Sequence, residues 1–137
     1  MDNKWRLRFI ALAQHIATWS KQEVKVGAVV TNSHRQLKGV GYNGPAESFN
    51  DAELTAENST FVTVHAEVNA LQNSVGDGLI LFVTSQPCLS CAAAIVASQR
   101  VVEVVMPTVG NSGRWSESQK QAIKHLEKKG IRVTYGG

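Results

Sequence analysis

Residues 65–67 read His65-Ala66-Glu67, and residues 87–91 read Pro87-Cys88-Leu89-Ser90-Cys91, with the first cysteine 23 positions after the histidine. Together these two stretches hold one imidazole, two thiols and one carboxylate. A structural zinc site takes four protein ligands, whereas a catalytic zinc keeps one position open for water. The imidazole and the two thiols supply three ligands, and the carboxylate stays outside that set. The pattern therefore predicts a catalytic zinc site, with His65, Cys88 and Cys91 as ligands and Glu67 beside them.

Each of these residues has its own chemical task. Zinc lowers the pKa of a bound water toward neutrality, which makes the water a nucleophile at physiological pH. Glu67 can accept the proton of that water and return it to another atom, so one carboxylate serves as base and then as acid. Cys88 follows a proline and is expected to open a helix over residues 89–98, where free amides and the helix dipole favour the thiolate. The pattern indicates a hydrolytic metal site.

Two other interpretations of the same residues stay open. A C-x-x-C pair after a strand is also the redox motif of thioredoxin-like proteins, although that motif requires neither His65 nor Glu67. A histidine and a glutamate on one helix can form a solvated surface pair, but residues 62–71 are too apolar for an exposed face. We expect these polar groups to lie in a cleft.

The size and composition of the chain indicate one compact domain, residues 1–137, because 137 residues that are 43% hydrophobic can bury one core. No apolar run approaches the length of a membrane span, and residues 1–6 lead into an amphipathic stretch without a signal-peptide cleavage pattern. The two cysteines are both used by the expected zinc site, so no disulfide is expected. We expect a cytoplasmic protein with no membrane partner.

The charge of the chain is slightly positive. Fourteen Lys and Arg residues against eleven Asp and Glu give a net charge of +3, which favours anionic partners weakly. The basic residues are scattered, and their one cluster, at residues 120–129, falls on an expected surface helix. This is not the basic stripe of a nucleic-acid-binding domain, so a small anionic ligand is expected instead.

Hydrophobic periodicity predicts alternating helices and strands. Helices are expected at residues 5–19, around the histidine at 65, at 89–98 and from 116 to 129, with a short one around 52–57. Strands are expected at 24–31, 37–42, 79–84, 101–106 and 131–135, the first two as a hairpin. Ser116 and Gln119 form a capping box for the last helix, which Gly130 ends. The order α-β-β-α-β-α-β-α-β predicts an α/β fold of three layers, α-β-α, with a central five-stranded mixed sheet and helices on both faces.

Three motifs together resemble one enzyme family: residues 65–70, residues 87–92, and Gly41-Tyr42-Asn43-Gly44, with further likeness at 25–30 and 83–84. The paired H-x-E and P-C-x-x-C motifs are the signature of zinc-dependent nucleobase deaminases. Over residues 5–106 the chain resembles the deoxycytidylate (dCMP) deaminases of the cytidine deaminase superfamily. The resemblance implies the cytidine-deaminase-like fold and zinc-dependent hydrolysis of dCMP to dUMP and ammonia, which feeds dTMP synthesis.

Two rival functions remain. The tRNA adenosine deaminases carry similar zinc motifs, but the 22-residue step from Asn43 to His65 is longer than is usual in them and similar to the deoxycytidylate family. A non-catalytic structural zinc module would need a fourth protein ligand. The further donors that are evident for it, His15, His34 and His125, lie in unrelated segments.

The resemblance also implies roles in substrate binding. Asn43 would hydrogen-bond the sugar 3′-hydroxyl, although an asparagine before Gly44 can equally be a left-handed turn residue. Lys25 would lie near the phosphate, although a solvated charge at a strand end is the alternative. Arg114 and Trp115 could supply a cationic clamp and a stacking wall, or Trp115 could be a buried residue at a helix entry.

The expected cofactor is one Zn²⁺ per chain. Many deoxycytidylate deaminases bind a second, structural zinc through extra cysteines and histidines, whereas this chain has Gln22, Glu23 and residues 49–51 at those places and no further cysteine. Asn73 and Gly76 differ from the residue types expected at a dCTP and dTTP effector site. The resemblance implies a deoxycytidine nucleotide as the small-molecule partner and a homo-oligomer, a hexamer, as the assembly.

Overall fold

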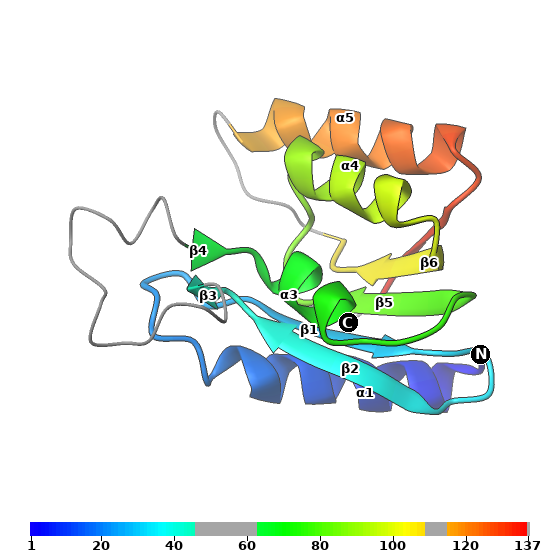
Figure 1. Cartoon of the computed structure of the whole chain (residues 1–137), viewed down its shortest axis with the longest axis horizontal. Helices are drawn as coiled ribbons and strands as arrows, with labels where there is room; N and C mark the ends of the chain where they lie inside the picture. Colours follow the sequence, from blue (N-terminus) through cyan, green and yellow to red (C-terminus); the bar gives the residue numbers. More distant parts are fainter. Residues whose placement is uncertain (46–62, 109–114, 137) are drawn as a thin grey trace.

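The computed structural model describes residues 1–45, 63–108 and 115–136. These residues form a five-stranded sheet with helices on both faces (Figure 1). The strands are β1 (Gly27–Thr31), β2 (Leu37–Tyr42), β5 (Leu79–Val83), β6 (Val101–Met106) and β7 (Arg132–Tyr135). Their order in the sheet is β2-β1-β5-β6-β7. β1 is antiparallel to β2 and to β5, whereas β5, β6 and β7 are parallel, so the predicted mixed sheet and α/β class are confirmed.

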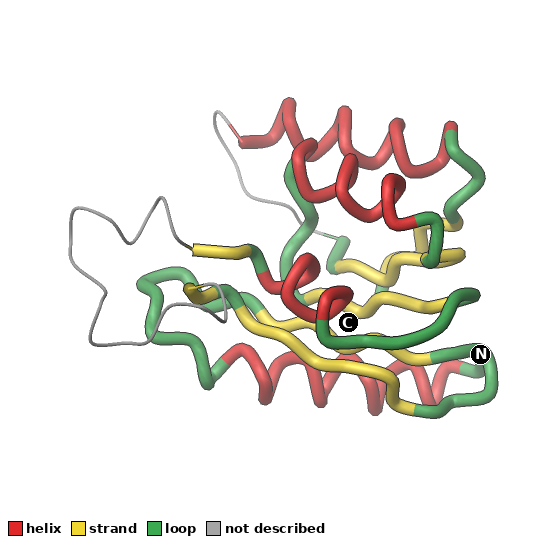
Figure 2. Tube along the Cα trace, viewed as in Figure 1, coloured by secondary structure: helices red, strands yellow, loops and turns green. Residues whose placement is uncertain are grey.

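Four helices are seen in the described part of the chain, and they cover the two faces unequally. They are α1 (Asn3–Ala17), α3 (Ala66–Gln72), α4 (Leu89–Ser98) and α5 (Trp115–Lys128). Helix α1 lies on one face, and the other three lie on the opposite face (Figures 1 and 2). Two short strands, β3 (Gly44–Pro45) and β4 (Thr63–Val64), pair antiparallel just before α3. The three-layer architecture expected from the sequence is therefore present.

Alternation along the central strands divides the core between the two faces. On β1, Val29 packs with Phe9, Ala13 and Ile16 of α1. Its neighbours Ala28 and Val30 belong to the larger cluster under α3, α4 and α5. Every residue of β1 and of β5 is buried, as expected for strands covered on both faces. Both faces of the sheet are thus covered by helices.

Glycine brings α3 directly onto the sheet at Gly41 in β2. A Cβ atom at this position would lie 2.4 Å from the backbone nitrogen of Ala70 and 2.8 Å from the carbonyl oxygen of Ala66. These are atoms of the α3 backbone, so they cannot move aside as a flexible side chain would. The absence of a side chain at Gly41 therefore sets how closely the helix that carries Glu67 approaches β2.

Arg100 stabilises the C-terminal end of α3. Its guanidinium donates hydrogen bonds to the carbonyl oxygens of Leu71 (2.9 Å), Ser74 (2.8 Å) and Gly76 (2.7 Å). These carbonyls lie at and just after the end of the helix, where the backbone has no helical partners. One side chain from the turn before β6 thus satisfies the end of α3.

Several predicted boundaries change in the structure. β1 begins at Gly27, not at residue 24, because the backbone of Val24 and Val26 bonds to the side chain of Asn43 instead of continuing the ladder. Helix α1 begins at Asn3 because Asp2 caps it, with Oδ1 3.0 Å from the nitrogen of Trp5. Helix α5 begins at Trp115, so Ser116 lies inside the helix and the predicted capping box is wrong.

Other predicted elements are as expected or lie outside the described part. The turn after α5 has Gly130 at φ +82°, which agrees with the predicted helix end. The short helix expected around residues 52–57 lies outside the described residues. No helix in the described ranges is long and apolar enough to cross a membrane.

Candidate active site

Two helix starts bring the three predicted metal ligands together. His65 is the N-cap of α3, and Cys88 is the N-cap of α4, with Cys91 in the first turn of the same helix. Helix α4 spans the residues predicted for it. The imidazole Nδ1 of His65 lies 2.9 Å from Sγ of Cys91 and 3.7 Å from Sγ of Cys88, and the two sulfurs are 3.4 Å apart. The structure thus places residues that are distant in sequence within one cluster.

The cluster fits zinc by its donor types and by its spacing. Around a tetrahedral zinc, with Zn–S bonds of about 2.3 Å and Zn–N bonds of about 2.0 Å, neighbouring donor atoms lie about 3.5 to 3.8 Å apart. The observed separations of 3.4 and 3.7 Å are close to these values, and the separation of 2.9 Å between His65 and Cys91 is shorter. Among the described residues, this is the one group of three or more His, Cys, Asp or Glu side chains whose donor atoms lie close together. It includes none of the other histidines.

Glu67 lies beside the cluster in the first turn of α3. Its side chain is buried, and its Oε1 lies 3.9 Å from Nδ1 of His65. Burial raises the pKa of Glu67 above its ordinary value, although hydrogen bonding to Cys91 opposes this. A carboxyl group in such surroundings can hold or release a proton closer to neutral pH than an exposed one.

The two thiols divide the negative charge of the site unequally. Hydrogen bonds with Cys91 and His65 lower the pKa of Cys88 to about 3. The hydrogen bond to Cys88, together with burial, raises the pKa of Cys91. The hydrogen bond to Cys88 also raises the pKa of His65, and burial opposes it. The lowered pKa of Cys88 has the direction expected for a thiolate ligand, but its main causes are these side-chain hydrogen bonds and not the helix start.

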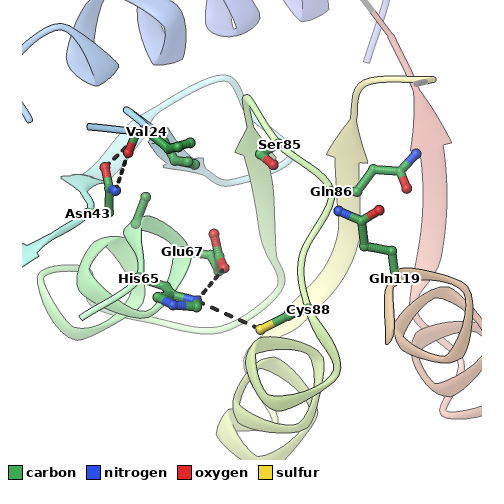
Figure 3. A pocket seen from close by; sticks show the side chains of 10 residues that line it. Val24, Asn43, His65, Glu67, Ser85, Gln86, Cys88 and Gln119 are labelled. Atoms are coloured by element: carbon green, nitrogen blue, oxygen red, sulfur yellow. Dashed lines mark hydrogen bonds and ion pairs between the residues drawn. The ribbon is translucent and has the colours of Figure 1, made fainter. Parts of the chain in front are cut away.

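A pocket of about 310 Å³ opens onto the cluster (Figure 3). Its lining residues are Val24, Val26, Asn43, His65, Ala66, Glu67, Ser85, Gln86, Cys88 and Gln119. The volume is at the lower end of the range of about 300–1,000 Å³ for small-molecule sites. None of these lining residues is a lysine or an arginine. The described wall of the pocket can therefore bind a small polar ring, but a phosphate would need cations from elsewhere.

Asn43 lines the pocket and fixes the neighbouring loop. Its Oδ1 accepts a hydrogen bond from the nitrogen of Val26 (2.9 Å), and its Nδ2 donates to the carbonyl of Val24 (2.6 Å). Its backbone is not left-handed, so the turn role considered for it from the sequence is wrong. Each end of an amide has room for a second hydrogen bond, and contact with a sugar hydroxyl stays a prediction.

Lys25 does not line the described pocket. Lys25 is exposed, and its ammonium donates to the carbonyl oxygen of Ser20. Arg114 lies outside the described residues, and Trp115 is the first residue of α5. Their roles toward a phosphate and a ring stay predictions.

Three polar residues of the pocket were not recognised from the sequence: Ser85, Gln86 and Gln119. Ser85 and Gln86 precede the Pro-Cys motif directly, so their proximity to the thiols could have been expected. The side-chain amide of Gln86 donates to the carbonyls of Pro107 (2.9 Å) and Thr108 (3.3 Å), which joins the loops after β5 and β6. No sequence signal pointed Gln119 to the pocket. Its spacing from Ser116 suggested a role in a helix cap instead.

Comparisons with known proteins agree with this geometry. Residues 3–108 match the model of the cytidine and deoxycytidylate deaminase zinc-binding region. An uncharacterized deaminase from Aliivibrio fischeri is 33% identical over 142 residues, covering 98% of this chain and 95% of that protein. Human deoxycytidylate deaminase is 34% identical over 105 residues, which are 68% of this chain and 59% of the human protein.

Among solved structures, the dCMP deaminase of the cyanophage S-TIM5, crystallised in complex with dCMP and dUMP, is similar over the whole fold. It has a TM-score of 0.78 at 26% identity, covering 99% of each chain. The motifs and the donor cluster agree with the match to a zinc-binding region. A protein with this zinc-binding region is a deaminase, an enzyme that acts on C–N bonds. The chain therefore belongs to the deoxycytidylate deaminase family of the cytidine deaminase superfamily.

Proposed function

We propose that this protein is a zinc-dependent hydrolase that converts dCMP to dUMP and ammonia. The observation that supports this best is the cluster of His65, Cys88 and Cys91 with the buried carboxylate of Glu67 beside it, at the base of a pocket. Three protein ligands leave one position of a tetrahedral zinc for water. A structural zinc module would close that position, and no further donor joins the cluster among the described residues.

Zinc bound at this cluster supplies a Lewis acid that lowers the pKa of a coordinated water toward neutrality. Glu67 accepts a proton from the attacking water and delivers it to N3 of the cytosine ring. The water oxygen adds to C4, and the bond from C4 to the exocyclic nitrogen then breaks. The second water proton leaves with that nitrogen as ammonia, so cytosine and water give uracil and ammonia. The raised pKa of the buried carboxyl is suited to both proton transfers.

The choice of a deoxycytidine nucleotide is supported by the resemblance of residues 5–106 and by the size of the pocket. Within the proposal, Asn43 contacts the sugar, and Lys25 and Arg114 contribute the positive charge that the described pocket lacks. Trp115 is proposed to form a stacking wall. Each chain is proposed to hold one zinc, because both cysteines are already used in the cluster. A cytoplasmic homo-oligomer that supplies dUMP for dTMP synthesis completes the proposal.

A panel of substrates tests the proposal. Ammonia release is measured from dCMP, dCTP, deoxycytidine and a tRNA anticodon stem-loop, each with and without added dCTP and dTTP. We expect dCMP to react with the highest kcat/KM. Reaction of the stem-loop alone would identify a tRNA adenosine deaminase instead. A zinc-loaded protein that releases no ammonia from any of the four would favour a structural module.

A further inference from the structure

Gln119 is a buried polar side chain that faces the pocket from the helix opposite the catalytic carboxylate. It is 5% exposed and belongs to the pocket lining. Its side-chain amide makes no hydrogen bond to another residue in the described ranges. The amide is not one of the fully enclosed side-chain atoms that lack a partner, which among the described residues is Oγ1 of Thr31, so water or a ligand in the pocket can bond it. Gln119 is therefore equipped to bond something that enters the pocket.

The position of Gln119 is held by contacts between α5 and α4. The hydroxyl of the preceding residue, Ser118, accepts a hydrogen bond from the backbone nitrogen of Leu89, at 3.0 Å. Leu89 directly follows the N-cap Cys88. The first part of α5 is thus bound to the helix start that carries a metal ligand, so the backbone of Gln119 has a fixed place relative to the cluster.

Figure 3 shows Glu67 and Gln119 on opposite sides of the pocket, with Cys88 between them. Gln86 lies on the side of Gln119, but its Nε2 already donates to the carbonyls of Pro107 and Thr108, on the loop after β6. In a pyrimidine ring C4 has two ring neighbours, N3 and C5. If C4 is attacked at the metal cluster and N3 faces Glu67, as the proposed function requires, the C5 edge faces Gln119.

We propose that Gln119 determines specificity at C5 of the pyrimidine, and that its amide favours a hydrogen-bonding substituent such as hydroxymethyl over methyl. The inference rests on the proposed function. A hydroxymethyl group can both donate to and accept from the amide, whereas a methyl group displaces water from the amide without replacing its hydrogen bonds. Gln119 lies beyond the residues that match the family model, 3–108, so this feature belongs to α5 and not to the zinc motifs.

The test compares 5-hydroxymethyl-dCMP with 5-methyl-dCMP on the zinc-loaded wild type and on Gln119→Leu. We expect the wild type to prefer the hydroxymethyl substrate. In Gln119→Leu, the ratio of the two kcat/KM values should fall about tenfold, the effect of one lost hydrogen bond to a neutral group. Because both substrates meet the same protein sample, the ratio does not depend on the fraction of the variant that folds.

Gln121→Leu is the matched control. Gln121 lies on α5 as well, but it is exposed and bonds Glu117 on the surface, with Nε2 3.2 Å from Oε1. Its removal should leave the ratio unchanged. If the ratio of the two kcat/KM values in Gln119→Leu equals that of the wild type, the assignment of Gln119 to C5 is overturned.

A binding measurement separates this inference from the proposed function. Calorimetric affinities of the product nucleotides 5-hydroxymethyl-dUMP and dTMP repeat the comparison without any turnover. If no deoxycytidine nucleotide reacts, the proposed function fails, and the loss of selectivity between the two products in Gln119→Leu still decides the inference. Equal affinity of the wild type for both products, or no binding of either, would overturn it.

Discussion

Oε1 of Glu67 lies 3.9 Å from Nδ1 of His65, the ring atom that also faces the two cysteine sulfurs. The carboxylate borders the donor cluster without being one of its three members. Both residues lie at the start of α3. Gly41 lets the first part of this helix approach β2, and Arg100 bonds the carbonyl of Leu71 near its end. The ligand role and the proton-transfer role can therefore be separated by mutation.

Glu67→Gln should keep the metal and lose turnover. The amide has nearly the shape of the carboxylate but cannot accept the proton of water, and general acid–base groups contribute about 10²- to 10⁴-fold to rates. We expect about one zinc per chain by elemental analysis and a kcat for dCMP reduced at least 100-fold. Activity above a few per cent of the wild type would show that Glu67 does not have this role.

Removal of zinc should abolish activity reversibly in the wild type, whereas a variant that lacks a ligand should hold no zinc to remove. Because the two thiols and the imidazole are the proposed ligands, a strong chelator is expected to abolish ammonia release, and stoichiometric Zn²⁺ to restore it. Cys88→Ala should purify without zinc and gain no activity when zinc is added. Two equivalents of zinc in the wild type would contradict the proposal of a single site, and full activity after chelation would contradict zinc catalysis.

The element order and the ligand cluster could be predicted because both depend on local patterns. The strands at 37–42 and 101–106 and the helix at 89–98 agree with the structure to the residue. Periodicity and cap residues are properties of neighbouring positions. The spacing of His65, Cys88 and Cys91 predicted the cluster because metal ligands must converge, whatever lies between them.

The parts that sequence could not give depend on contacts between distant elements. Gln119 lies three positions after Ser116 and suggested a capping box, because nothing local indicates that α5 packs against the start of α4. The late start of the first strand has a similar cause. Residues 24 and 26 continue its apolar alternation, but the side-chain amide of Asn43 bonds the nitrogen of Val26 and the carbonyl of Val24.

Gly41→Ala should destabilise the protein strongly. The new Cβ atom would lie 2.4 Å from the nitrogen of Ala70, so either β2 or α3 must shift. Overpacking of this kind costs about 3 kcal/mol, which corresponds to a fall in Tm of about 10 °C for a chain of this size. Gly44→Ala is the control, because its Cβ would meet, within the described ranges, the Tyr42 ring at 3.6 Å and no backbone atom. A thermal melt that shows equal Tm values for the two variants would contradict the close approach of α3.

Asn43→Ala should reveal whether the side chain bonds the sugar or only the loop. Its amide holds the backbone of Val24 and Val26 with one hydrogen bond from each end, which leaves one lone pair and one hydrogen for a substrate. Loss of the loop contacts alone would lower kcat/KM equally for dCMP and for its 2′,3′-dideoxy analogue. Contact with the 3′-hydroxyl adds a loss for dCMP only, so we expect the ratio of the two kcat/KM values to fall about tenfold. The ratio is insensitive to how much of the variant is folded, and an unchanged ratio would limit Asn43 to supporting the pocket wall.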